Sequence, residues 1–423
     1  MHSSGAGRRA DVVFARCCHP PQGGRQRGRD AVGLLHHPQH AVPDLQGQKR
    51  GLCEAENDSP PPHRRGTLRP DKAAGSQKRP QLRRVPRRRG FLERENGADG
   101  RSELNVPQIT IVILQYRPDA AVLRRTLASL AMQDTRDFAV VLGDDGSAQD
   151  YFAESRAYLA AHGITDVQTT KLQPNGGTVK NARNAVRAAA TRWVLMLSPG
   201  DFLYDSETLR WWLGRLQADE PRVAFGRQAY FTPDPPQPTA GETPFDRTPY
   251  DPAHYDAKAI RRNLLLYDDG ISGAGLVYER ALFLSALDKM ADHVRLAEDF
   301  SLRLFAVQGV RITRYDRLTV WYEYGGGVST DAAARARMLG DWRAMLEVLR
   351  AEYPRDRTVR LAYEYYFNDR RKSRLVRGLV GRLIVPQNAP FKKAQRAWQP
   401  PTNGDAAKLR TVYEFAEKEN AAE

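Results

Sequence analysis

Residues 109–147 read ITIVILQYRPDAAVLRRTLASLAMQDTRDFAVVLGDDGS, and this stretch decides the fold. It opens with the apolar run Ile109–Leu114, which is typical of a buried strand. Leucines at helical spacing follow, at Leu123, Leu127 and Leu130, and a second short apolar run occupies Phe138–Leu142. The stretch therefore predicts one strand-helix-strand unit.

The same alternation continues along the chain. We expect a helix over about 150–161, a strand near 166–171, a helix over about 178–190 and a strand at 193–197. Farther on, the pattern predicts helices near 279–289 and 298–308 and a strand at 310–315. Alternating strands and helices indicate an α/β fold with a mostly parallel sheet flanked by helices. Ligands of such sheets bind at the carboxyl ends of the strands.

The composition divides the chain into three parts. Residues 1–104 contain no Trp or Tyr and are rich in Arg, Pro and Gly, so we expect a disordered segment. Residues 105–330 form the predicted catalytic domain, and residues 331–423 a basic, helical C-terminal extension. A Pro-rich stretch at 232–252 reads as a long surface connection, either a lid beside the site or a bland insertion.

Most of the net charge of +15 lies in residues 1–104. This distribution argues against a folded basic surface for nucleic acid, and no nucleic-acid partner is expected. The three cysteines, Cys17, Cys18 and Cys53, also lie there, so disulfides play no part in the predicted core. The chain lacks the apolar run of a signal peptide or a membrane-spanning helix, which predicts a cytoplasmic protein. An upstream start assigned in error would equally explain the first segment.

Two polar turns follow predicted elements of the sheet. Asp144 and Asp145 end the second strand in the sequence Gly-Asp-Asp-Gly-Ser, and Asn175, Gly176 and Gly177 precede a helix. An Asp-Gly turn by itself needs no ligand. A carboxylate at this edge can also accept hydrogen bonds from ribose hydroxyls or a base N–H. The two glycines let the backbone approach a ligand and open a helix whose N-terminus favours negative charge.

The order of these motifs resembles family 2 of the inverting glycosyltransferases, which have the GT-A fold. The resemblance spans the Asp-Asp-Gly-Ser loop, the Asn-Gly-Gly loop and the Ala-Arg-Asn helix start at 182–184. It implies binding of a nucleotide-diphosphate sugar by a set of residues spread over four motifs: Tyr116, Asp144, Asp145, Asn175, Gly176, Gly177, Lys180, Arg183, Asn184 and Ser198. Outside this context, Arg183 reads as a solvated helix residue.

The family's metal-binding Asp-x-Asp motif is incomplete in this chain. Ser198 and Gly200 stand at the usual acidic positions, and only the trailing Asp201 is a carboxylate. Mg²⁺ often takes one or two protein carboxylates together with substrate phosphates. The resemblance therefore implies Mg or Mn at Asp201. The alternative is a Pro-Gly turn in which Asp201 caps the next helix, with Lys180 neutralising the leaving diphosphate.

The sequence Ala-Glu-Asp-Phe at 297–300 resembles the family's Glu-Asp motif. The resemblance implies that Asp299 is the general base and that Glu298 lies on the acceptor side. A carboxylate in this role takes the proton of a weakly acidic sugar hydroxyl. Gly273, Ala274 and Gly275 resemble the small-residue segment that lines the acceptor pocket. The alternative is an acidic pair in a first helical turn, which the helix dipole favours.

Residues 370–385 combine arginines with apolar residues at helical spacing. This pattern favours peripheral contact with an anionic membrane on its inner face, where a lipid-linked acceptor would lie. Docking against the catalytic domain or a partner explains it equally well. Gly378 and Gly381 weaken the predicted helix.

The resemblance therefore implies a hexosyltransferase-like enzyme that moves a sugar to a glycan or lipid-linked acceptor in surface polysaccharide biosynthesis. The alternative keeps the fold but loses turnover, leaving a sugar-nucleotide-binding or scaffold protein. The incomplete metal motif motivates that alternative.

Overall fold

The computed structural model describes residues 108–325, 332–367, 379 and 381–420. Strands β1 (Ile109–Gln115) and β2 (Phe138–Asp144) are fully buried and pair in parallel, from Ile109 opposite Phe138 to Gln115 opposite Asp144. Helix α1 (Ala120–Ala131) joins them, and the side chain of Asp119 caps it by accepting from the backbone N–H of Val122 at 3.1 Å. The predicted strand-helix-strand unit is confirmed.

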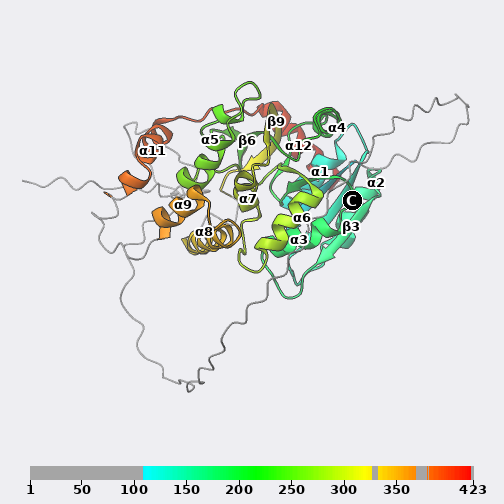
Figure 1. Cartoon of the computed structure of the whole chain (residues 1–423). Helices are drawn as coiled ribbons and strands as arrows, with labels where there is room; N and C mark the ends of the chain where they lie inside the picture. Colours follow the sequence, from blue (N-terminus) through cyan, green and yellow to red (C-terminus); the bar gives the residue numbers. More distant parts are fainter. Residues whose placement is uncertain (1–107, 326–331, 368–378, 380, 421–423) are drawn as a thin grey trace, which may run out of the picture. The chain divides into compact units, whose positions relative to one another are not determined.

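The next four elements follow the predicted order, and two elements for which no bounds were predicted come after them. In chain order they are α2 (Phe152–Ala161), β3 (Val167–Lys171), α3 (Thr178–Ala188) and β4 (Trp193–Leu197), followed by β5 (Phe202–Leu203) and α4 (Thr208–Asp219). Strands β3, β2, β1 and β4 lie side by side in this order, and all are parallel. Their carboxyl ends therefore meet at one edge of the sheet. Figure 1 shows β3 with α3 beside it.

The second half of the sheet is mixed. It contains β6 (Val223–Pro233), β7 (Pro236–Thr239), β8 (Val277–Glu279) and β9 (Ile312–Glu323). Strand β8 pairs antiparallel with both β4 and β6, whereas β9 runs parallel to β6 and antiparallel to β5. Within the described residues these strands complete one nine-stranded sheet, which confirms the α/β fold class.

Helices cover both faces of the sheet. Alternate residues of β1 point to opposite sides, because successive side chains of a strand alternate. Ile109, Ile111 and Ile113 pack with residues of α1, α2 and α4, whereas Val112 and Leu114 pack with α3 and with α6 (Arg280–Met290). Each face thus has its own apolar core.

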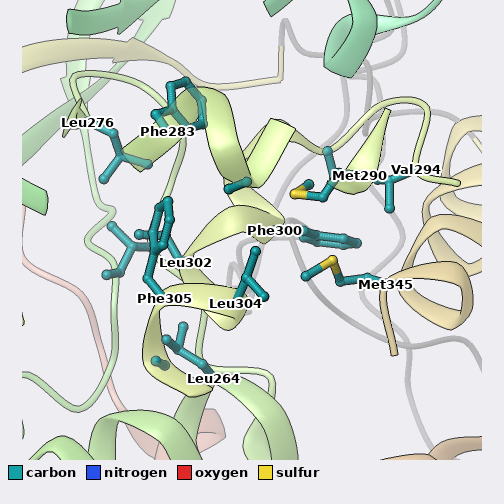
Figure 2. Close-up of a cluster of buried hydrophobic side chains, with 14 of the residues drawn as sticks. Leu264, Leu276, Phe283, Met290, Val294, Phe300, Leu302, Leu304, Phe305 and Met345 are labelled. Carbon is teal, nitrogen blue, oxygen red and sulfur yellow. The ribbon is translucent and has the colours of Figure 1, made fainter. Parts of the chain in front are cut away.

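The core beneath α6 continues into the segment that carries the predicted base. Phe300 ends the short 3-10 helix η4 (Glu298–Phe300), which leads directly into α7 (Ser301–Gln308). Its ring is buried between Met290 and Val294 on one side and Met345 on the other (Figure 2). Apolar packing therefore fixes the backbone beside Glu298 and Asp299.

The segment after β6 differs from the predicted surface connection. The chain turns after Pro233 and runs back as β7, which pairs with β6 from Tyr230 opposite Thr239 to Pro233 opposite Pro236. A prolyl residue can occupy an edge strand because its missing N–H is not needed there. Beyond this hairpin lie the short helices η2 (Thr248–Tyr250), α5 (Ala257–Arg262) and the π-helix η3 (Asn263–Tyr267). The stretch 232–252, interpreted as a surface connection, thus contains the second strand of an edge hairpin.

The described C-terminal part is mainly helical. It contains α8 (Ala332–Glu352), α9 (Arg357–Phe367), α11 (Asn388–Ala397) and α12 (Ala406–Asn420). Trp342 and Met345 of α8 belong to the same core cluster as Phe300, and Tyr413 of α12 packs with Phe202 and Trp321. Both helices therefore pack against the elements that carry the predicted site.

Three sequence expectations fall partly or wholly outside the described residues. The predicted disordered segment 1–104 is one of them, and most of 370–385 is another, of which Leu379 and 381–385 are described. The boundary near 330 is the third. In the described part of the chain, no helix has the length and apolar character needed to cross a bilayer.

Candidate functional site

Asp145 is the centre of a buried hydrogen-bond cluster at the carboxyl end of β2. Its carboxylate accepts hydrogen bonds from the backbone N–H of Gly176 at 2.7 Å and of Gly177 at 2.9 Å. It also accepts one from Nδ2 of Asn175 at 2.9 Å. The two predicted turns therefore meet, although about thirty residues separate them in the sequence. The neighbouring Asp144 stabilises the turn that follows β2, because its Oδ1 accepts a hydrogen bond from the N–H of Ser147 at 2.6 Å.

The cluster holds a negative charge away from bulk water. Burial raises the pKa of Asp145 above its ordinary value, while the N–H groups of Gly176 and Gly177 and the Arg295 guanidinium act in the opposite direction. Hydrogen bonds to the ionised form stabilise it. The ionised carboxylate of Asp145 thus holds the glycine loop (residues 175–177) through hydrogen bonds.

Gly177 has a conformation that a side chain would disrupt. Its φ is 92° and its ψ is 162°, a region that residues other than glycine rarely occupy. A Cβ at this position would lie 2.5 Å from the carbonyl oxygen of Arg295. Both the backbone conformation and the close packing therefore require glycine at the start of α3.

Arg295 is a residue of this site that no motif in the sequence indicated. One guanidinium nitrogen donates to Oδ1 of Asn175 at 2.5 Å, and the Arg295 carbonyl accepts from the N–H of Val179 at 3.1 Å. The side chain is exposed and lies close enough to lower the pKa of Asp145. Only the fold brings this cation to the glycine loop.

The other cations predicted for the donor lie on α3 and face carboxylates near α6. Lys180 Nζ lies 3.6 Å from Asp292 Oδ1, and Arg183 Nη1 lies 4.0 Å from Asp288 Oδ1. Asn184 is half-buried on the same helix. A diphosphate would have to compete with these ion pairs for Lys180 and Arg183.

Tyr116 lies at the carboxyl end of β1, where the parallel strands end. Its ring is 44% exposed, and the Arg117 guanidinium lies 5.0 Å from the ring centre. The N–H of Arg117 donates to Oγ of Ser147 at 2.8 Å, which ties the turn after β1 to the turn after β2. The structure thus presents an aromatic surface beside Asp144 and Asp145.

The turn after β4 brings Asp201 next to a second carboxylate. A Cβ built on Gly200 would lie 3.0 Å from Oε2 of Glu323, the last residue of β9. Burial, followed by repulsion from Glu323, raises the pKa of Asp201 to about 8. Oε2 of Glu323 is buried with no hydrogen-bond partner among the described residues. Sequence analysis missed Glu323, because a glutamate at the end of a strand carries no local signal.

The helix-capping alternative for Asp201 was wrong. The chain continues from Asp201 into strand β5, and the next helix, α4, begins only at Thr208. The backbone N–H of Asp201 bonds to the carbonyl of Ser198 at 2.9 Å, which closes the turn. Ser198 itself is half-buried at this turn.

Glu298 and Asp299 form a second carboxylate pair. Burial raises the pKa of both side chains, and the mutual repulsion raises that of Glu298 further. The Arg303 guanidinium opposes the shift of Asp299, whereas Asp201 adds to that of Glu298. Arg303 therefore favours the ionised form of Asp299.

The predicted acceptor segment lies against this pair. A Cβ at Gly273 would lie 3.1 Å from Oε1 of Glu298, and the N–H of Gly275 donates to the carbonyl of Met196 on β4 at 2.8 Å. Ala274 is buried between them. Small residues thus leave room beside Glu298 while the backbone stays attached to the sheet.

Four carboxylates consequently act on one another at this edge of the sheet: Asp201, Glu298, Asp299 and Glu323. Repulsion of this kind favours a bound cation or a shared proton. The described residues contain no group of three or more His, Cys, Asp or Glu side chains arranged to hold a metal ion.

Residues 110–282 match the family model described as Glycosyl transferase family 2. The match includes Asp144, Asp145 and Asp201 and the glycine loop, and it ends before Glu298 and Asp299. No curated protein matches the chain.

Two solved structures illustrate what the fold is similar to. TarS of S. aureus matches over 73% of this chain and 55% of its own, with 16% identity and a TM-score of 0.41, so this chain spans about half of its length. The mannosyltransferase PcManGT from Pyrobaculum calidifontis, solved with GDP-Man and Mn²⁺, matches over 75% of this chain and 87% of its own, with 15% identity and a TM-score of 0.43. Together with the order of the strands, the family match identifies residues 110–282 as a glycosyl transferase family 2 domain with the GT-A-type fold.

Proposed function

We propose that this glycosyltransferase is an inverting enzyme of hexosyltransferase type. It moves a sugar from a nucleotide-diphosphate sugar to a glycan or lipid-linked acceptor, and it serves cell-surface polysaccharide synthesis. The observation that carries the proposal is the half-buried Asp299, whose pKa desolvation raises and whose Cβ would lie 3.7 Å from a Cβ at Gly273 of the small-residue segment.

Asp299 acts as the general base in this proposal. The acceptor oxygen attacks the anomeric carbon while its proton passes to the Asp299 carboxylate. The bond from that carbon to the diphosphate oxygen breaks, and its electron pair leaves with the diphosphate. Attack opposite the leaving group inverts the anomeric configuration. A base with a raised pKa holds the transferred proton more firmly, and Arg303 keeps it ionised before the reaction.

The donor nucleotide binds along the carboxyl ends of β1, β2 and β4 in this proposal. Asp144 and the rigid loop around Asp145 hold the nucleoside, and the exposed ring of Tyr116 packs against it. The predicted polar set completes the contacts: Asn175, Gly176, Gly177, Lys180, Arg183, Asn184 and Ser198. Arg295 adds a cation to the same edge.

Family membership also implies a divalent metal, and two residues fit it. Asp201 and Glu323 are adjacent carboxylates, and Oε2 of Glu323 is a buried acceptor that has no hydrogen-bond partner among the described residues. Oxygen ligands of this kind suit Mg²⁺ or Mn²⁺. When bound, the metal would neutralise charge on the diphosphate. Glu323 thus offers a replacement for the acidic positions occupied by Ser198 and Gly200.

Peripheral attachment to the inner face of a membrane is part of the proposal. Leu379 and Leu383 are 64% and 74% exposed and lie four residues apart in the sequence, with the exposed Arg382 between them. Apolar residues at this spacing beside arginines suit an anionic lipid surface. A cytoplasmic enzyme attached in this way would meet a lipid-linked acceptor.

A donor-binding screen tests the proposed function. UDP-, GDP- and dTDP-sugars are titrated against the full chain by calorimetry, with and without Mn²⁺, and a CMP-sugar serves as the control that lacks a diphosphate. We expect one diphosphate donor to bind and its binding to strengthen with Mn²⁺. Binding with no turnover on any acceptor would favour the sugar-nucleotide-binding scaffold instead. Absence of binding by every diphosphate donor would contradict both.

A further inference from the structure

Asp341 of α8 lies beneath the segment that joins α6 to the predicted base. Its Oδ1 accepts from the backbone N–H of Arg295 at 3.1 Å, and its Oδ2 accepts from the N–H of Leu296 at 2.6 Å. The side chain is 7% exposed. A buried carboxylate with two backbone donors is a strong and directional anchor.

The anchored segment touches both halves of the site. On one side, Arg295 bonds through its side chain to Asn175 and through its carbonyl to the N–H of Val179. On the other side, Glu298 and Asp299 follow Leu296 within three residues. The segment has no regular secondary structure, so its N–H groups need partners from elsewhere in the fold.

We propose that Asp341 is a positioning residue, which fixes the position of the donor-binding loop relative to the general base. The inference rests on the proposed function and adds a residue from α8, which lies beyond the part of the chain that matches the family. The connection runs from Asp145 through the glycine loop to Arg295, and from Arg295 to Asp341 and Asp299. Loss of the anchor therefore loosens both the donor site and the base.

The test compares Asp341→Asn with a matched control, Asp356→Asn. Asp356 is also an aspartate of low exposure in the C-terminal part of the chain. Its side chain caps α9, away from the site, by accepting a hydrogen bond from the N–H of Val359 at 3.0 Å. Asparagine keeps the size of the side chain but offers a single acceptor oxygen. Hydrogen bonds to a charged group are strong, so we expect roughly a tenfold loss in donor affinity and a comparable fall in kcat.

Hydrogen exchange without ligand supplies the readout that does not depend on function. We expect Asp341→Asn to speed exchange in peptides covering 174–180 and 294–300, and Asp356→Asn to leave both unchanged. Faster exchange in 294–300 alone, unchanged donor affinity, or an equal effect of Asp356→Asn would each overturn the proposal. If the wild-type chain binds no nucleotide sugar, the proposed function fails, and the exchange data still decide the role of Asp341.

A second variant covers the case in which Asp341→Asn does not fold. Arg295→Ala removes an exposed side chain and its bond to Asn175 but keeps the backbone. We expect an unchanged melting temperature, faster exchange in 174–180 and weaker donor binding. Donor affinity equal to that of the wild type in this variant would contradict the link between Arg295 and the donor loop.

Discussion

Replacing Gly177 by alanine tests whether the glycine loop is fixed by its surroundings. The residue has a φ of 92°, and a Cβ would come within 2.5 Å of a backbone oxygen, that of Arg295, which cannot rotate away. Forcing a side chain into this backbone region costs about 1–3 kcal/mol. Displacing the loop also weakens the bond from its N–H to Asp145, a charge-assisted contact of about 1.5–3 kcal/mol. We therefore expect a loss of about 2–6 kcal/mol in the free energy of unfolding.

Gly309→Ala provides the matched control for this substitution. Gly309 has a φ of 73° at the end of α7, and a Cβ there would meet no atom within 4 Å. Its cost is that of the left-handed conformation alone, about 1–2 kcal/mol.

Urea denaturation of both variants and donor titration of both are the assays. We expect Gly177→Ala to be the less stable variant and to bind the donor at least tenfold more weakly, whereas Gly309→Ala keeps the donor affinity of the wild type. If Gly177→Ala loses no more stability than Gly309→Ala and binds the donor normally, the loop is not fixed in the way the structure indicates.

Three further predictions concern the carboxylates. Burial raises the pKa of Asp299, and its ionised form is the base. We therefore expect kcat to rise with pH with an apparent pKa above the ordinary aspartate value of about 3.9. An apparent pKa at or below that value would contradict the assignment. Glu323→Gln should weaken Mn²⁺ binding about tenfold in calorimetry, as loss of one charged ligand would, and equal affinity would remove Glu323 from the metal site. Arg303→Met removes the guanidinium that pairs with the buried Asp268 at 3.1 Å and leaves Lys392 acting on its charge, so the free energy of unfolding should fall by about 3–5 kcal/mol in urea titration. A loss below about 1 kcal/mol in the free energy of unfolding would show that the buried charge of Asp268 is neutralised in another way.

The sequence could predict the strands and the turns that follow them. Residues such as Ile109–Leu114 form a strand because their apolar side chains must be buried, and parallel strands bring the turns after them to one edge. Asp145 and Asn175 could therefore be assigned to the same site before any coordinates. Their direct hydrogen bond confirms that they lie together.

The remaining site residues depend on contacts between distant segments. Glu323 lies at the end of β9 and meets Asp201 only because β5 pairs with β9. Arg295 and Asp341 are ordinary charged residues by type and spacing, and they become partners only when α8 packs beneath η4. The hairpin of β6 and β7 was missed for a local reason, since proline is depleted in strands and four prolines lie at 233–238.

The most direct test of the central claim is Asp299→Asn, assayed for donor binding and for turnover with the donor that the screen identifies. We expect the variant to bind the nucleotide sugar as the wild type does, because Asp299 belongs to the acceptor side. We also expect a fall of at least a hundredfold in kcat for release of the nucleoside diphosphate, in keeping with loss of a general base. Turnover within a few-fold of the wild type at unchanged donor affinity would contradict the claim that Asp299 takes the proton of the acceptor.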